Sequence, residues 1–209
     1  MSHEKFNTAF AHLPLVAILR GITPSEVEPI ALALYAEGFR LIEVPMNSPS
    51  VLDSIATLAR VLPPDALLGA GTVLDTATVQ AVQQAGGQLI VMPHADTAVI
   101  REAKRLGLGC VPGAATPTEA FAAVAAGADA LKLFPAELVT PTVLKAMRAV
   151  LPRELALLPV GGITPAGMAP YRAAGAAGFG LGSALYAPGM DAAAVAARAR
   201  EFVAAWRAG

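Results

Sequence analysis

The chain contains 209 residues, of which 55% are hydrophobic and 15% are charged, and its formal net charge is −1. This length is enough for one substantial core, so we expect a single domain over residues 1–209. The near-neutral charge argues against a nucleic-acid partner and against a role at a membrane surface. Because so few charged residues would cover the surface only sparsely, we expect part of it to be buried between subunits.

Cys110 is the only cysteine, which excludes a disulfide framework and a thiolate metal site and fits a reducing compartment. We expect this thiol to be part of the core. The first residues, MSHEKFNTAFAHLP, contain no apolar signal core. The long uncharged stretch at 173–190 is broken by glycines and a proline and is too weakly apolar to span a membrane. The sequence therefore predicts a soluble, cytoplasmic protein.

In chain order, the first expected element is a helix at about residues 4–12, which would close the bottom of the fold. Eight short apolar runs follow, and their length and composition are typical of strands buried on both faces. They are VAILRG (16–21), LIEVPMN (41–47), LLGAGT (67–72), LIVMPH (89–94), GCVPGA (109–114), ALKLFPA (130–136), ALLPVGG (156–162) and GFGLGSAL (178–185).

Helix-start signals separate these runs. A Ser, Thr or Asp side chain can cap the first free N–H groups of a helix, and proline fits the first helical position. Glu26 and Glu119 are placed to complete capping boxes. The Ser-Pro and Thr-Pro signals are TPSE (23–26), SPSV (48–51), TPTE (116–119), TPTV (140–143) and TPAG (164–167).

Eight strand–cap–helix units without a polar linker predict an α/β fold, namely a small (β/α)₈ TIM barrel with an extra N-terminal helix. A doubly wound open sheet is the alternative. That fold usually needs fewer strands and often has a glycine-rich turn after the first one, which VAILRGITP does not provide.

In such a barrel the active site lies at the carboxyl ends of the strands. These positions are occupied by Arg20, Glu43, Asn47, Thr72, His94, Lys132, the pair Gly161–Gly162 and the pair Gly182–Ser183. No HxH, HExxH or carboxylate cluster accompanies the three histidines, so no metal site is expected, and His94 is interpreted as a residue of the rim.

Lys132 and Glu43 are single charges within apolar strands, in ALKLFPAE and LIEVP. Burial favours the neutral form of each, which makes the amine a nucleophile and suits the carboxyl group to proton transfer near neutral pH. The alternatives are a lysine that reaches water at a strand end and a structural salt bridge from Glu43 to Lys132 or Arg20. The planar guanidinium of Arg20 is equally suited to a substrate carboxylate.

The glycine pairs fall in the loops after strands seven and eight, where barrels commonly bind phosphate through backbone N–H groups. The alternative is that these glycines only make tight turns. Together, these parts indicate one reaction class, in which a lysine forms a Schiff base with a ketone and a carboxylate moves protons. The protonated imine is an electron sink, so a neighbouring carbon–carbon bond can break without a metal or another cofactor.

The motifs LRGITP, IEVPMNSP, GAGTVL, PGAATPTEAF, LKLFPAE, VGGITP and GLGSALY together resemble the class I aldolases of 2-keto-3-deoxy-6-phospho sugar acids. These enzymes release pyruvate and glyceraldehyde 3-phosphate, and are usually homotrimers of (β/α)₈ barrels. The resemblance implies that Lys132 forms the Schiff base and Glu43 is the proton shuttle. It also implies that Arg20 and Thr72 bind the carboxylate end, and that Gly161, Gly162, Gly182 and Ser183 bind the phosphate.

Two branches of this family use substrates that are epimers at C4, derived from gluconate or from galactonate. Asn47, Val160 and the ending GLGSALY depart from the gluconate pattern of EVTLRTE, PTGGI and IGGSWL, and are similar to the galactonate branch. His94 departs from the asparagine expected there. The galactonate-derived substrate is therefore favoured, with the gluconate-specific aldolase as the alternative. A phosphate-binding isomerase or synthase and a non-catalytic phosphosugar-binding barrel are the alternatives from other classes.

Overall fold

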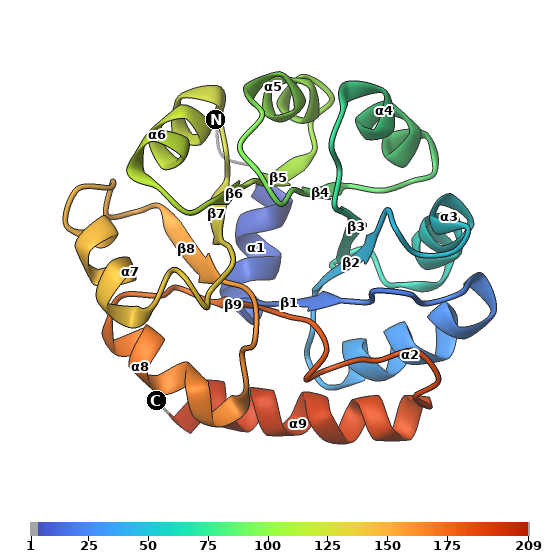
Figure 1. The fold of residues 1–209 in the computed structure, drawn as a ribbon. Helices are drawn as coiled ribbons and strands as arrows, with labels where there is room; N and C mark the ends of the chain where they lie inside the picture. Colours follow the sequence, from blue (N-terminus) through green and yellow to red (C-terminus); the bar gives the residue numbers. More distant parts are fainter. Residues whose placement is uncertain (1–3, 209) are drawn as a thin grey trace.

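The structure is a computed structural model that describes residues 4–208 of the chain. Strands and helices alternate along the described chain, and the helices lie outside the strands (Figure 1). The strands are β1 (Leu15–Ile18), β2 (Leu41–Pro45), β3 (Leu67–Gly71), β4 (Leu89–Val91), β5 (Gly109–Val111), β6 (Gly113–Ala114), β7 (Ala130–Leu133), β8 (Ala156–Pro159) and β9 (Phe179–Leu181). The helices are α1 (Glu4–His12), α2 (Pro24–Ala36), α3 (Val51–Val61), α4 (Thr76–Gln84), α5 (Thr97–Arg105), α6 (Pro117–Ala126), α7 (Pro141–Arg148), α8 (Met168–Ala173), which follows the 3₁₀ turn η1 (Pro165–Gly167), and α9 (Ala192–Ala208).

All the strand pairs are parallel, as predicted, but they form two hydrogen-bonded sheets rather than one closed ladder. The sheets have the orders β5-β4-β3-β2-β1-β9 and β6-β7-β8. The expected fifth strand is divided because Pro112, which has no N–H group to donate, stands between β5 and β6. On the other side, one bridge between Val160 and Gly180 connects the end of β8 with β9. The α/β alternation is therefore confirmed, whereas the continuous eight-stranded ladder is not observed.

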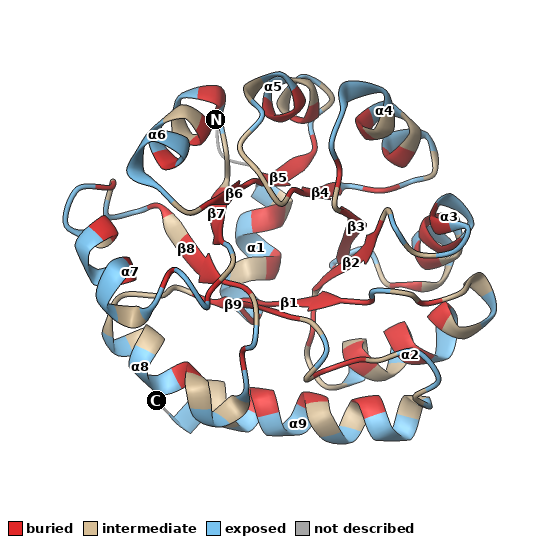
Figure 2. Cartoon of the chain, viewed as in Figure 1, coloured by how far each residue is buried: buried red, intermediate tan, exposed pale blue. Residues whose placement is uncertain are grey.

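Two groups of buried side chains make the core, and the strands contribute to both. Figure 2 shows the strands coloured almost throughout as buried. The larger group fills the space between the strands and the outer helices. The smaller one includes Phe6 and Ala9 of α1 together with residues of seven strands: Val16, Leu41, Leu67, Leu89, Val91, Val111, Ala130 and Leu158. The predicted N-terminal helix is confirmed, and it packs against this inner group, where it is visible through the centre of Figure 1.

The helix-start signals at Thr23, Thr116 and Thr140 are confirmed, whereas Thr164 caps the 3₁₀ turn η1 and α8 begins only at Met168. Thr116 shows the expected capping box, since its hydroxyl accepts from the Glu119 N–H and its own N–H donates to the Glu119 carboxylate. The SPSV signal is wrong as a helix start, because α3 begins only at Val51, after Ser50 in a left-handed conformation. The Ser48 hydroxyl instead accepts a hydrogen bond of 2.9 Å from the Gly21 N–H, which connects the loops that follow β1 and β2.

We predict that Phe6→Ala lowers the free energy of unfolding by about 3–5 kcal/mol, because the Phe6 ring is 1% exposed within the inner group. Phe10→Ala is the matched control, since this ring stacks on Phe6 at 5.5 Å but is only half-buried. Denaturant titration of both variants measures the difference. Equal losses of unfolding free energy in the two variants would contradict the view that α1 packs into the inner group mainly through Phe6.

Candidate active site

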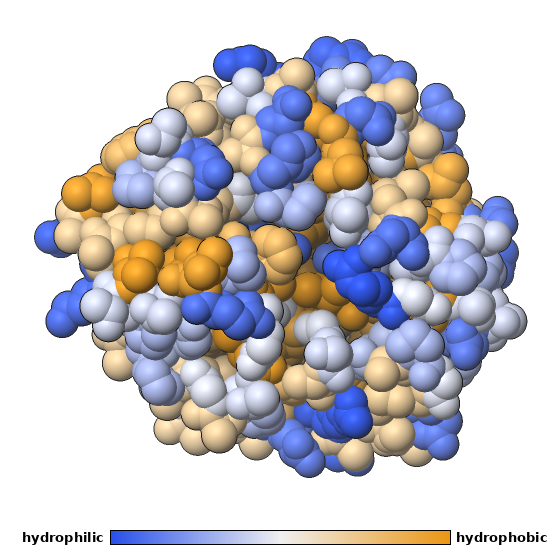
Figure 3. Space-filling model, viewed as in Figure 1, coloured by the Kyte–Doolittle hydropathy of each residue, from blue (hydrophilic) through white to orange (hydrophobic). Residues whose placement is uncertain are grey.

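Most of the predicted site residues lie around one cavity of about 140 Å³ at the carboxyl ends of β1, β7, β8 and β9. Figure 3 shows this side of the molecule, with a hollow near its centre whose deeper atoms are largely apolar. Arg20, Lys132, Val160, Gly161, Gly162, Gly182 and Ser183 were predicted from the sequence, and the other lining residues are Ile18, Phe134, Ile163 and Ala184. The structure therefore brings together one amine, one guanidinium and two glycine-rich loops.

Glu43 lies deeper in the same region, beside Lys132. A second cavity, of about 10 Å³, is lined by Glu43, Lys132 and otherwise apolar or glycine residues such as Val16 and Leu158. This volume corresponds to about one water molecule, so bulk solvent does not separate the two side chains. Lys132 lines both cavities, so it stands between the buried Glu43 carboxyl group and the larger cavity of about 140 Å³.

Lys132 is buried in β7 between Leu131 and Leu133, with 4% of its surface exposed. Burial lowers the pKa of this amine, attraction to Glu43 opposes the shift, and repulsion from Arg20 adds to it. The ammonium nitrogen lies 4.7 Å from the ring centroid of Phe134. An amine with a lowered pKa is more often neutral and is therefore a better nucleophile toward a carbonyl carbon.

Glu43 is 1% exposed in β2, and its Oε2 atom has no hydrogen-bond partner. Burial raises the pKa of this carboxyl group to about 7, although attraction to Lys132 and then to Arg20 opposes the rise. The carboxyl group lies directly against Gly71 of β3, where any side chain would overlap it. A group with this pKa can both accept and release a proton at neutral pH.

The structural salt bridge that was the alternative for Glu43 is not observed in residues 4–208. Arg20 is exposed, and its guanidinium donates a hydrogen bond of 2.5 Å to the Oδ1 atom of Asn47. Asn47 therefore holds Arg20 at the rim of the cavity. The other N–H groups of the guanidinium are left to face a carboxylate ligand.

Thr72, Asn47 and His94 were also predicted site residues, but they do not line the cavity that holds Arg20 and Lys132. Thr72 directly follows Gly71 and has a left-handed backbone with φ of 56°, a conformation that is costly for a β-branched residue and is typical of functional sites. His94 is half-buried, and its Nδ1 atom is buried without a hydrogen-bond partner in the described part of the chain.

The two predicted phosphate loops each contain glycines. Gly161 and Gly162 both have positive φ angles, of 119° and 59°, which L-residues rarely adopt. A side chain at Gly182 would meet no atom within 4 Å, so an oxygen atom of a ligand has room to approach this backbone. Ser183 adds a hydroxyl group on the same wall of the cavity.

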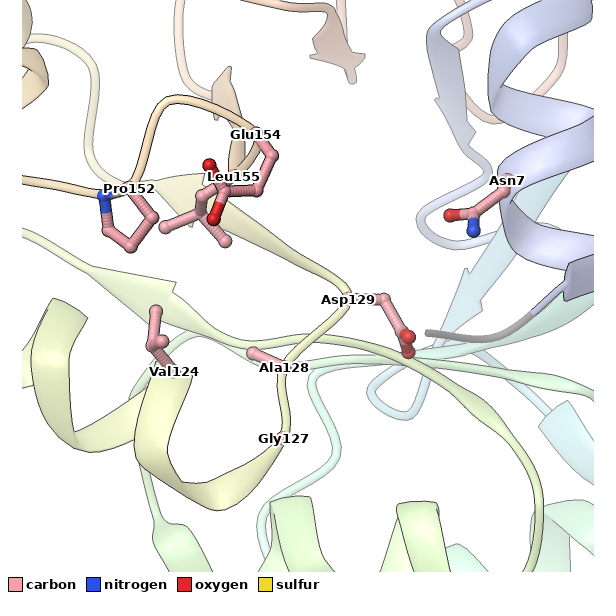
Figure 4. Close-up of a pocket in the computed structure, with 8 residues that line it drawn as sticks. All are labelled: Asn7, Val124, Gly127, Ala128, Asp129, Pro152, Glu154 and Leu155. Atoms are coloured by element: carbon pink, nitrogen blue, oxygen red, sulfur yellow. The ribbon is translucent and has the colours of Figure 1, made fainter. Parts of the chain in front are cut away.

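A larger cavity, of about 440 Å³, lies at the opposite end of the strands (Figure 4). It is bordered by Asp129 and Leu155, which directly precede β7 and β8, and by Asn7 of α1. The Asp129 carboxylate there accepts hydrogen bonds from Lys104 at 2.6 Å and from the Cys110 N–H at 2.8 Å. Asp129 is therefore committed to structural contacts, whereas Glu154, the other acid that lines this cavity, is exposed.

No group of three or more His, Cys, Asp or Glu side chains is arranged to hold a metal ion in residues 4–208 of the chain. No described helix is both long and apolar enough to cross a membrane.

The fold and the site thus define an α/β protein with a buried lysine and a buried carboxylic acid at the carboxyl ends of parallel strands. The chain belongs to the KDPG and KHG aldolase family, whose model matches residues 7–197. It is 49% identical over 195 residues to the Rhizobium meliloti (strain 1021) protein named "Probable 2-dehydro-3-deoxy-6-phosphogalactonate aldolase", covering 93% of this chain and 92% of the relative. It is 47% identical to the 2-dehydro-3-deoxy-6-phosphogalactonate aldolase of Escherichia coli (strain K12), covering 93% and 95%.

Solved structures agree with this family. The structure described as "Native KDPGal structure" superposes with a TM-score of 0.92 at 46% identity, covering 94% of this chain and 95% of that one. A KDPG aldolase from Legionella pneumophila, with pyruvate captured as a covalent carbinolamine intermediate, has a TM-score of 0.79 at 25% identity, covering 96% and 95%. The identity is therefore much higher to the proteins named for galactonate than to this KDPG aldolase.

We predict a pH-dependent stability difference between the wild-type protein and Glu43→Gln. The pKa of Glu43 is raised from 4.5 to about 7, so the folded protein holds this proton more tightly than the unfolded chain does. The resulting stabilisation is complete below pH 4.5 and is lost as the pH rises to about 7. Relative to wild type, the variant should therefore gain roughly 3 kcal/mol in free energy of unfolding between pH 4 and pH 8.

Denaturant titrations of both proteins across this pH range measure the gain. Glu28→Gln is the control, because Glu28 is exposed on α2. A difference between Glu43→Gln and wild type that stays constant with pH would contradict the raised pKa.

Proposed function

We propose that this protein is a class I aldolase that cleaves 2-dehydro-3-deoxy-6-phosphogalactonate to pyruvate and glyceraldehyde 3-phosphate. The observation that carries the proposal is the pair of buried groups, since Lys132 with a lowered pKa and Glu43 with a pKa of about 7 line one small apolar cavity. The relatives named for this substrate, at 47% and 49% identity, support the choice of the galactonate branch.

In the proposed reaction, the neutral Lys132 amine attacks the C2 carbonyl carbon of the substrate. The hydroxyl group of the resulting carbinolamine takes the proton of Glu43 and leaves as water, which gives a protonated imine. Glu43 accepts the proton of the C4 hydroxyl group. The C3–C4 bond then breaks, its electron pair moves into the imine to give an enamine, and the aldehyde leaves. Glu43 returns this proton to C3, and water then hydrolyses the protonated imine to pyruvate and the neutral amine. The proton released in the hydrolysis restores the neutral form of Glu43. No metal is required, because the imine accepts the electron pair.

The rim residues orient the substrate around this amine. Arg20, held by Asn47, and Thr72 bind the carboxylate end. The phosphate at the other end is bound by the backbone N–H groups of Gly161, Gly162 and Gly182 and by Ser183. Val160 and Asn47 set the preference at C4, since they stand where the gluconate pattern has a threonine and an arginine. Val160 removes a polar partner for the C4 hydroxyl group, and such a loss can switch the preferred epimer.

The proposal extends to the assembly. Residues 1–209 act as one domain, in which the two sheets, joined through Pro112 and the Val160–Gly180 bridge, work as the ring of a (β/α)₈ barrel. The protein acts in the cytoplasm as a homotrimer without a cofactor. Exposed apolar side chains, among them Leu74, Phe121 and Leu138, support burial of surface between subunits.

The first test of this function is borohydride trapping. Incubation with pyruvate and borohydride should give a stable mass adduct on Lys132, because borohydride reduces the imine to an amine that cannot hydrolyse. The adduct should be absent from Lys132→Ala, and Lys145→Ala, which removes a lysine of α7, is the matched control. Binding of phosphosugars without any pyruvate adduct would support the non-catalytic alternative instead.

A second prediction concerns metals. Cleavage activity should be retained in EDTA, because the imine replaces the electrophilic metal of other aldolases. Loss of activity on chelation, with recovery on adding a divalent cation, would move the mechanism to metal-assisted chemistry.

The choice between the two branches is tested by comparing kcat/KM for the two C4 epimers. We expect the galactonate-derived epimer to be preferred, since Asn47 and Val160 stand where the gluconate pattern has an arginine and a threonine. A preference of about tenfold or more for the gluconate-derived epimer, roughly 1.4 kcal/mol in transition-state binding, would reverse the assignment.

A further inference from the structure

Glu137 ends the motif LKLFPAE and has no role in the mechanism described above, yet its carboxylate lies in the proposed phosphate site. A methyl group placed on Gly161 would lie 2.6 Å from the Glu137 Oε2 atom, and one placed on Gly162 would lie 3.1 Å from Oε1. Both oxygen atoms therefore lie over the loop between β8 and η1, on the side where these glycines have no side chain.

The backbone around Glu137 is firmly held. The Ala136 N–H donates to the Val160 carbonyl at 2.9 Å, and the Tyr171 hydroxyl donates to the Ala136 carbonyl at 2.8 Å. Ala136 is buried, whereas Glu137 itself is exposed. The carboxylate can therefore leave the glycine loop by a change of side-chain rotamer, without any movement of the backbone.

The negative charge of Glu137 affects the pKa of a neighbouring side chain, Tyr171. The pKa of the Tyr171 hydroxyl is raised by burial first and then by the negative charge of Glu137. A phosphate group bound to the backbone of Gly161 and Gly162 would face the same carboxylate, and two anions in contact repel one another. The free protein thus carries an anion of its own where the substrate brings its phosphate.

We propose that Glu137 is a specificity-determining residue whose carboxylate competes with phosphate for the Gly161–Gly162 loop and turns outward when a phosphorylated ligand binds. The inference rests on the proposed function. A substrate that is covalently attached to Lys132 keeps its phosphate at the loop despite the competition. After the C3–C4 bond breaks, glyceraldehyde 3-phosphate has lost this attachment, so the returning carboxylate favours its release. Free inorganic phosphate is disfavoured for the same reason.

The test compares wild-type protein with Glu137→Gln, which removes the charge and keeps the shape. Calorimetric titration with inorganic phosphate should give a dissociation constant that is about two- to fivefold lower for the variant, a range typical of partly exposed charge pairs. This gain should shrink as the salt concentration rises, because salt screens the repulsion. In cleavage assays, phosphate should inhibit the variant more strongly, and KM should fall while kcat does not increase.

Glu154→Gln is the matched control, because Glu154 is exposed and borders the cavity at the opposite end of the strands. It should bind phosphate like the wild type. An unchanged or weaker affinity of Glu137→Gln for phosphate would overturn the proposal. Failure of the proposed function is a separate outcome, because borohydride trapping with pyruvate involves no phosphate and does not depend on Glu137.

Discussion

The structure depends on one electrostatic constraint, which is that an amine and a carboxyl group are both buried in an apolar interior without forming an ion pair. Burial disfavours the charged form of each, so Lys132 gives up its proton more readily and Glu43 keeps its proton up to about pH 7. A close salt bridge would restore both charges and remove the nucleophile. The reactivity proposed for Lys132 depends on its attraction to Glu43 being weaker than the cost of burial.

The rest of the fold maintains this apolar interior. Gly71 leaves room for the Glu43 carboxyl group against β3, and Phe6 of α1 packs with the inward side chains of the strands. Bulk water is therefore kept out on the side of α1. On the other side of Lys132, the cavity of about 140 Å³ has room for a ligand. This arrangement lowers the stability of the fold, because burying each ionisable side chain costs free energy of folding. The two clusters of apolar side chains in the core must offset this cost.

Much of this arrangement was predictable from the sequence. Strand and helix positions follow from short apolar runs and Thr-Pro caps, and Lys132 and Glu43 are conspicuous as single charges in such runs. The divided ladder at Pro112, the Arg20–Asn47 hydrogen bond and the position of Glu137 over Gly161 were not predicted. The division has a local cause in Pro112, whereas the other two features arise from contacts between segments far apart in the chain, for which local periodicity contains no signal. Ser48 shows this most clearly, since its hydroxyl bonds to Gly21 rather than capping its own helix.

The two hydrogen bonds between the loops after β1 and β2 have an evolutionary consequence. Arg20 is bound by Asn47, and Gly21 is bound by the adjacent Ser48, so the two loops behave as one unit. Mutations in either loop are then expected to be epistatic, with the effect of a change at position 47 determined by what occupies position 20. Natural divergence in substrate preference would accordingly proceed through paired replacements. A mutant library that randomises both loops together would sample such pairs far more efficiently than libraries that randomise each loop alone.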